Sequence, residues 1–201
     1  SIKPNKDNFY TVNDIEGLKI SILHTGLQEP LIVLPPVNGI YTLLSGERRY
    51  TALKSLVAGG NDKFRKVYCK IIDPDDLKVN LTYEEKVRWL ITTTNSEQRD
   101  KTNQDILNEI KVIRNTYKKL KESGEAVPSV LRPFIAKSLG MSETQVQRFT
   151  SIEKNLLYEF FDMFCDDKLN ISVADSICKL QNEVQKQKQK IKANKKELNS
   201  N

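Results

Sequence analysis

Side chains that bind transition metals or form disulfides are scarce in this sequence of 201 residues. It contains one histidine, His24, and three cysteines, Cys69, Cys165 and Cys178, which form no Cys-x-x-Cys pair. Structural zinc sites take four closely spaced Cys or His ligands, and a disulfide framework needs an even number of cysteines. The sequence therefore argues against a zinc protein, a histidine-dependent hydrolase and a disulfide-stabilised secreted domain. It predicts a reducing, cytoplasmic environment.

Long hydrophobic runs are also missing. The longest apolar stretch, 31–37, is broken by Pro35 and Pro36 and falls far short of the ~18 residues of a membrane span. The first residues, SIKPNKDNF, lack the basic-then-apolar pattern of a secretory signal. Only 8 glycines and 7 prolines occur, which excludes collagen-like and low-complexity classes. We expect no membrane association.

Basic residues are in mild excess. Lys and Arg total 32 against 26 acidic residues, a net charge of +6, which is compatible with a polyanionic partner without proving one. The excess is sharpest in 183–201, which holds six lysines and two glutamates. The same tail is equally explained as the solvated end of a helix.

Hydrophobic spacing divides the chain into three regions: 1–78, 79–157 and 158–201. The first alternates helices and strands, because apolar residues recur with helical period in 12–25 and 47–58 and form short runs in 31–34, 41–45 and 67–72. The dipeptide Asn38-Gly39 predicts a hairpin turn between the first two strands.

The other two regions are predicted to be helical. Helices are expected from the capping box at 82–85 to about 91, at 103–122, as a pair around Gly140, and from Ile171 onward. The expected fold class is α+β: a small mixed α/β lobe (1–78), a helical domain (79–157), and a C-terminal helical segment with a basic tail (158–201).

The segment 131–153 has the steric pattern of a helix-turn-helix. Ala136 supplies a small side chain where two helices cross, Gly140 follows four residues later at the turn, and Val146 follows six residues after that as an apolar contact. An ordinary helical hairpin with a glycine turn is the alternative.

The second helix of this pair carries polar side chains suited to DNA. Gln and Arg form paired hydrogen bonds with adenine and guanine edges in the major groove. The candidate DNA-binding residues are Ser142, which would also cap the helix, Glu143, Thr144, Gln145, Gln147 and Arg148.

A second candidate site lies where a predicted strand meets a predicted helix, at Ser45-Gly46-Glu47-Arg48-Arg49. Glycine permits close approach of a ligand, helix-start amides attract anions, and adjacent arginines suit phosphate oxygens. The segment is not a Walker A motif, which requires Gly-Lys-Ser/Thr. An anion site and a charged helix start that pairs with local acids are both compatible with these residues.

Four segments in this order resemble the ParB partition family. They are GLQEPL (26–31), SGERRYTAL (45–53), a helical segment with Asn95 and Gln98-Arg99, and the helix-turn-helix, followed by KLNISVADSICKL (168–180). The resemblance covers about 2–180. The same amino-terminal fold occurs in sulfiredoxin, but that enzyme needs a cysteine that this loop lacks.

The resemblance implies a CTP-gated DNA clamp that acts in plasmid or chromosome segregation. Such a protein binds double-stranded DNA at a particular site and also binds CTP and Mg²⁺. It forms a homodimer that depends on nucleotide or DNA, and it works with a ParA-like ATPase on the nucleoid or plasmid. The residues implied in nucleotide binding are Gly26, Leu27, Ser45, Gly46, Glu47, Arg48, Arg49, Asn95 and Arg99. We expect weak self-association of this chain without nucleotide.

The third nucleotide segment departs from the family pattern. The family usually has a Glu before the Asn, whereas Thr93 and Thr94 precede Asn95 here. Asn95 and Glu97 are the candidate metal ligands, and Glu47 is the candidate catalytic residue of a slow CTPase. Hydrolysis is left open. The rival interpretation is a transcription regulator of a phage or mobile element that keeps the ParB architecture without nucleotide switching.

Overall fold

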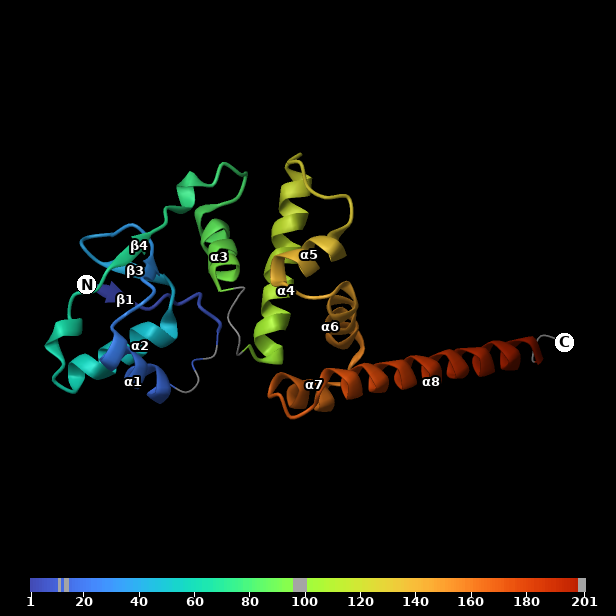
Figure 1. The fold of residues 1–201 in the computed structure, drawn as a ribbon. Coiled ribbons are helices and arrows are strands. Elements are labelled where there is room, and N and C mark those ends of the chain that lie inside the picture. The colour runs from blue at the N-terminus through green and yellow to red at the C-terminus, as the bar shows by residue number, and fades with distance from the viewer. Residues whose placement is uncertain (11, 13–14, 96–100, 199–201) are drawn as a thin grey trace. The chain divides into compact units, whose positions relative to one another are not determined.

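The computed structural model describes residues 1–10, 12, 15–95 and 101–198 (Figure 1). The chain forms two compact units, one of Ser1–Arg99 with Lys111–Leu131 and the other of Asp100–Ile110 with Arg132–Asn201. Helix α4 (Asn103–Glu122) therefore contributes residues to both units. The α+β class expected from the sequence is confirmed, with a small mixed sheet and a majority of helices.

A four-stranded sheet of order β1-β3-β2-β4 organises the first unit. Strands β2 (Leu31–Val33) and β3 (Tyr41–Ser45) are antiparallel, while β1 (Ile2–Lys3) pairs parallel to β3 and β4 (Cys69–Ile71) pairs parallel to β2. Asn38 and Gly39 both have positive φ between the bridge residues Val37 and Ile40. This is the tight turn that the sequence predicts, since two successive positive φ values match the twist of a hairpin.

Helices cover the two faces of this sheet. One face packs against α1 (Glu16–Thr25) and α2 (Glu47–Ala58), with a core of Ile22, Leu31, Val33, Leu43, Ala52, Leu53, Leu56 and Phe64. The other face packs against α3 (Tyr83–Thr94) through Tyr10, Leu34, Leu44, Val87 and Ile91. Successive residues of a strand point to opposite faces, so Leu43 and Leu44 enter different cores. Each such buried leucine contributes about 1.5–3 kcal/mol.

Two short 3₁₀ turns, Asp62–Phe64 and Pro74–Asp76, flank β4. Helix α3 begins at a complete capping box formed by Thr82 and Glu85, as the sequence predicts. Glu85 also pairs with Lys119 of α4. This ion pair links α3 to the part of α4 that belongs to the same unit.

The second unit is entirely helical over its described residues. It contains α5 (Leu131–Leu139), α6 (Glu143–Asn155), α7 (Tyr158–Cys165) and the long helix α8 (Ile171–Leu198). Phe149 of α6 and Phe164 of α7 are both buried, with ring centroids 5.6 Å apart. The start of α4 joins this core because Asn103 donates from its backbone to Asp167 and from its side chain to the carbonyl of Phe164.

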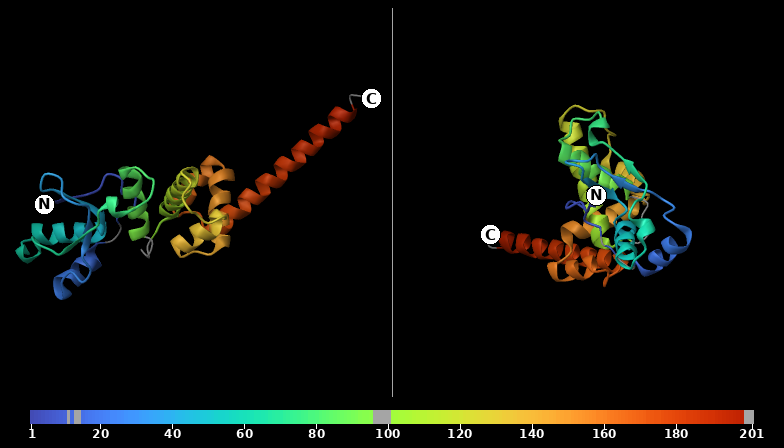
Figure 2. Two further views of the ribbon diagram at one scale, coloured as in Figure 1. Left: turned by 90° about the horizontal axis from the view of Figure 1, so that it is seen from above. Right: turned by 90° about the vertical axis from the view of Figure 1, so that its left-hand side faces the viewer.

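The C-terminal part of α8 extends beyond the other helices of its unit (Figure 2). Ala174 and Cys178 in its first turns are buried, and this end of α8 packs on α6. Within the described part of the chain, no helix combines the length and the apolar character needed to span a bilayer.

Candidate functional site

The Gly-Glu-Arg-Arg motif (46–49) forms the turn between β3 and α2. Gly46 has φ +100° and precedes the first residue of α2, Glu47. A methyl group at Gly46 would lie 3.0 Å from Leu31 Cδ2 and 3.3 Å from the Arg49 guanidinium. Glycine is required here both by its backbone conformation and by the close approach of Leu31. Because glycine has no capping side chain, the amides that begin α2 keep their capacity to bind an anion.

Ser45 connects this turn to the end of α3. Its hydroxyl donates a hydrogen bond of 2.9 Å to Oδ1 of Asn95, the residue that follows α3. The amide of Asn95 in turn donates to the carbonyl of Ile91 at 2.7 Å. Both polar groups of the Asn95 side chain are therefore oriented by the fold. The second and third segments of the ParB resemblance meet at this contact.

Arg49 connects the turn to the segment 26–31. Its Nη1 donates to the backbone carbonyls of Glu29 and Pro30, both at 3.0 Å, and lies 3.1 Å from the Glu29 carboxylate. The Arg49 side chain is largely buried, whereas that of Glu29 is exposed. The described partners of Arg49 are thus protein groups, and its main structural contribution is to fix the chain just before β2.

Glu47 is the acidic side chain of the motif. Asn8 donates to its carboxylate at 3.2 Å. Partial burial raises the pKa of Glu47, and the hydrogen bond from Asn8 opposes that rise by stabilising the charged form.

A cavity of about 420 Å³ lies over this motif, and we name it the GERR cavity. Its volume is within the range of small-molecule sites. Six residues predicted from the sequence line it: Ser45, Gly46, Glu47, Arg48, Arg49 and Asn95. Two others do not. Gly26 ends α1 with φ +77°, and Leu27 packs against the core of the sheet.

Several residues that line the GERR cavity were not predicted as site residues from the sequence. They are Asn8, Tyr10, Val12, Leu18, Glu29, Leu44 and Thr94. The N-terminal segment carries no motif that would have indicated it. Glu29 was visible in the GLQEPL segment, but its pairing with Arg49 depends on tertiary contacts.

Two further predicted residues, Glu97 and Arg99, lie outside the described residues. Among the residues that are described, no three His, Cys, Asp or Glu side chains gather into a cluster that could hold a metal ion without other ligands. Magnesium bound with a nucleotide commonly takes one or two protein carboxylates and fills its other positions with phosphate oxygens and water. Glu47 and Asn95 both line the GERR cavity, so one carboxylate and one amide oxygen of the kind that Mg²⁺ prefers are available there.

The predicted pair of helices around Gly140 is present as α5 and α6. Gly140 has φ +62°, and Ala136, Val146 and Phe149 are buried. The backbone N–H of Met141 donates to the carbonyl of Ala136 at 2.9 Å, which closes the end of α5. The three residues singled out from the sequence are therefore a buried small side chain in α5, the glycine of the turn and a buried apolar side chain in α6.

The candidate DNA-binding residues lie at the start of α6 but differ in the contacts that they make within the protein. Glu143, Thr144 and Gln147 are exposed. Ser142 and Gln145 form a complete capping box, in which the Ser142 hydroxyl accepts from the Gln145 N–H and the Gln145 side chain accepts from the Ser142 N–H.

Arg148 lies against helix α8. Its Nε is 3.8 Å from the carboxylate of Asp175, which also pairs with Lys179 at 2.8 Å. Asp175 is buried, so α8 fixes the base of the Arg148 side chain while more than a third of that side chain remains exposed.

The chain is similar in structure to a ParB protein. Over 88% of its length it matches 80% of the crystal structure of the C-terminally truncated chromosome-partitioning protein ParB from Caulobacter crescentus complexed to the centromeric parS site. The TM-score is 0.54 and the sequence identity is 22%. The same protein complexed with CTP-γ-S matches with a TM-score of 0.36 and 25% identity, over 88% of this chain and 87% of that chain.

No protein-family model and no curated protein sequence matches the chain. The fold likeness extends over both units, and it agrees with the order of segments found in the sequence. This chain therefore has a ParB-like fold.

Proposed function

We propose that this protein is a ParB-like partition protein that binds double-stranded DNA and is gated by CTP. The observation that carries the proposal is the GERR cavity. Three segments far apart in the sequence, around Glu29, at 45–49 and at Asn95, meet there at the start of a helix. They are the same three segments, in the same order, on which the resemblance to ParB rests.

The nucleotide phosphates would bind at the start of α2, where backbone amides and Arg48 supply positive charge. Bound Mg²⁺ would neutralise the phosphates, with Asn95 and Glu47 as its oxygen ligands among the described residues, and with Glu97 as the candidate beyond them. Arg49 would act by holding the preceding loop in place. Glu47 is also the candidate residue for slow CTP hydrolysis.

DNA would bind through α5 and α6 used as a helix-turn-helix. The start of α6 exposes Thr144 and Gln147, and Arg148 is anchored at its base. Such polar side chains at the start of a second helix are suited to base edges in the major groove. The Caulobacter ParB of the same fold is complexed to parS DNA, which supports DNA as the ligand of this unit.

In the cell, this chain would dimerise around DNA when nucleotide is bound and would work with a ParA-like ATPase on nucleoid or plasmid DNA. The proposed functional regions are a nucleotide-binding lobe (1–78), a DNA-binding domain (79–157) and a C-terminal helical segment (158–201), and their boundaries differ from those of the two compact units. The net charge of +6 favours approach to DNA without giving sequence preference.

Calorimetry tests the nucleotide part without knowledge of the DNA site. Wild-type protein is titrated with CTP, ATP, GTP and UTP, each with and without Mg²⁺, and Arg48→Ala and Arg65→Ala are compared. We expect selective binding of CTP, loss of binding in Arg48→Ala, and no loss in Arg65→Ala, because Arg65 lies outside the GERR cavity and pairs with Asp62. Equal loss in both variants would refute the assignment of the site.

The rival function is a DNA-binding regulator without nucleotide switching. The absence of an acidic side chain at Thr93 and Thr94, and the engagement of Arg49 with Glu29 and Pro30, favour it. Folded wild-type protein that binds a selected duplex but none of the four nucleotides, with or without that duplex, would establish the regulator in place of the clamp.

A further inference from the structure

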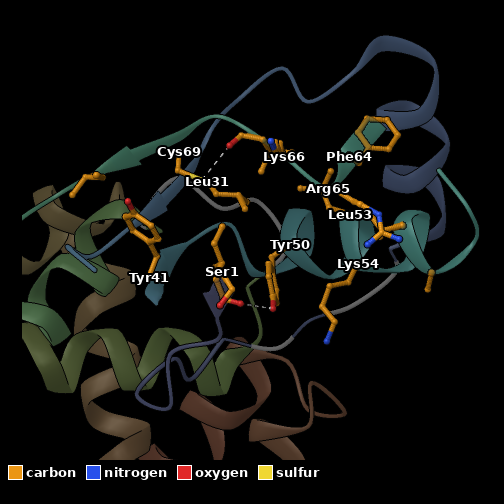
Figure 3. A pocket seen from close by; sticks show the side chains of 15 residues that line it. Ser1, Leu31, Tyr41, Tyr50, Leu53, Lys54, Phe64, Arg65, Lys66 and Cys69 are labelled. Atoms are coloured by element: carbon orange, nitrogen blue, oxygen red, sulfur yellow. Dashed lines mark hydrogen bonds between the residues drawn. The ribbon is translucent and has the colours of Figure 1, made fainter. Parts of the chain in front are cut away.

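A second cavity, of about 820 Å³, opens on the α2 side of the sheet, and we name it the β4 cavity (Figure 3). It shares no lining residue with the GERR cavity. Tyr41, Leu31 and Cys69 line it from the sheet, and Tyr50 and Leu53 line it from α2. The α2 side of the sheet is therefore incompletely covered, and a hollow with a mainly apolar lining is left beside the core.

The charged side chains around the β4 cavity are all basic. Lys54, Arg65 and Lys66 line it, and none of its lining residues is acidic. Lys70 is also exposed, but it lies in β4 between the lining residues Cys69 and Ile71, so its side chain is on the opposite face of the strand. Asp62, which does not line the cavity, pairs with Arg65 at 2.7 Å. An occupant of this cavity must therefore bring apolar surface for the hollow and negative charge for its rim.

The cavity lies beside an exposed sheet edge. Strand β4 is the last in the order β1-β3-β2-β4, and among the described residues no strand pairs with its outer side. An edge strand offers backbone N–H and C=O groups to a further strand. Two large side chains are exposed at this edge, Tyr68 at 92% and Ile71 at 52%. Tyrosine of this kind is typical of the centre of protein interfaces.

We propose that the β4 cavity and the edge of β4 together bind an extended, acidic peptide segment of a partner protein. The segment pairs with β4 through its backbone and places one large apolar side chain in the cavity. Its carboxylates contact Lys54 and Lys66 beside the cavity, and Lys70 on the opposite face of β4. Strand addition of this type takes its affinity from the backbone and its specificity from side-chain pockets. Here the structure provides both the edge and the pocket.

The charge pattern favours such a partner over a second copy of this chain. In a symmetric dimer through this surface, the same basic side chains would face one another across the interface. Like charges in contact oppose association. An acidic partner removes that repulsion, and the open sheet edge suits a strand better than a compact ligand.

Peptides displayed on phage, with twelve random residues, provide the probe. They are selected on the wild-type protein, and synthetic copies of the enriched sequences are measured by fluorescence anisotropy. We expect enrichment of Asp and Glu around an aliphatic or aromatic residue, and weaker binding as NaCl rises from about 50 to 300 mM. Lys66→Glu and Ile71→Asp should each weaken binding by about tenfold or more.

Matched controls separate this surface from general effects of charge and folding. Lys121→Glu and Ile20→Asp change exposed residues of the same types on α4 and α1, and neither should alter peptide affinity. Circular dichroism checks that all four variants fold. Arg48→Ala should also bind the peptide normally, so a failure of the nucleotide proposal and a failure of this one are distinguishable.

Three results would overturn the proposal. The first is that no peptide is enriched, or that the enriched peptides are basic. The second is that Ile71→Asp, shown to be folded, binds the acidic peptide as well as wild type does. The third is a dimer in sedimentation analysis that Ile71→Asp abolishes, which would make this surface a contact between copies of the chain.

Discussion

Replacement of Gly46 by alanine should damage both the stability and the proposed nucleotide site. The residue has φ +100°, a conformation that costs an L-residue about 1–3 kcal/mol. The added methyl group would also lie 3.0 Å from Cδ2 of Leu31, which is fully buried and has little room to move. Overpacking of this kind costs about 1–3 kcal/mol more. We expect the free energy of unfolding to fall by about 2–6 kcal/mol.

Gly60→Ala is the matched control for this prediction. Gly60 has φ +89°, but nothing lies within 4 Å of the added methyl group, so only the backbone strain is shared. Urea unfolding followed by the fluorescence of Trp89, the only tryptophan and part of the same unit, measures both variants. Gly46→Ala should be less stable than Gly60→Ala by about 1–3 kcal/mol. Equal losses of stability in the two variants would show that Leu31 shifts to accommodate the methyl group and that its close approach to Gly46 does not affect stability.

Three other substitutions test separate parts of the molecule. Ser142→Ala removes the capping box of α6 and should lower the free energy of unfolding of its unit by about 0.5–2 kcal/mol, measured by chemical denaturation. Arg148→Ala should weaken binding to a duplex selected from a random pool by about 1–3 kcal/mol, with nucleotide binding unchanged in calorimetry. Burial raises the pKa of Glu47 in the folded state, so ionisation of its carboxylate destabilises that state. This destabilisation grows as pH rises from the pKa of the unfolded state through the raised pKa. The stability of Glu47→Gln relative to wild type should therefore increase between pH 4 and pH 7, and a constant difference would contradict the effect of burial.

The helices were predictable because their signals are local. Apolar spacing and end residues indicated 47–58 and 103–122, and the structure has helices with these bounds. The capping boxes at Thr82 and Ser142 were likewise visible, since each is formed by residues three positions apart. Strand β1 was not predicted, because it has only two residues and exists through pairing with Tyr41 and Thr42, far along the chain.

The composition of the GERR cavity was only partly predictable for the same reason. Residues 45–49 adjoin one another in sequence, so their motif identified them together. Asn8 enters the site through a hydrogen bond to Glu47 across 39 positions, and no local pattern indicates such a contact. Arg49 was expected to contact phosphate, but its described hydrogen bonds are to the carbonyls of Glu29 and Pro30. These carbonyls lie within reach of Arg49 because β2 begins directly after them.

If α6 binds DNA as proposed, its capping box limits how the protein could acquire a new DNA preference. Gln145 is at once a candidate contact to bases and the side chain that closes the cap with Ser142, so most substitutions there would sacrifice helix stability. Thr144 and Gln147 are exposed and take no part in that cap. Variants that bind altered DNA sites should therefore diverge first at positions 144 and 147, and change position 145 only after stabilising substitutions elsewhere. The two hydrogen bonds of the capping box thus determine the order in which substitutions at these positions are tolerated.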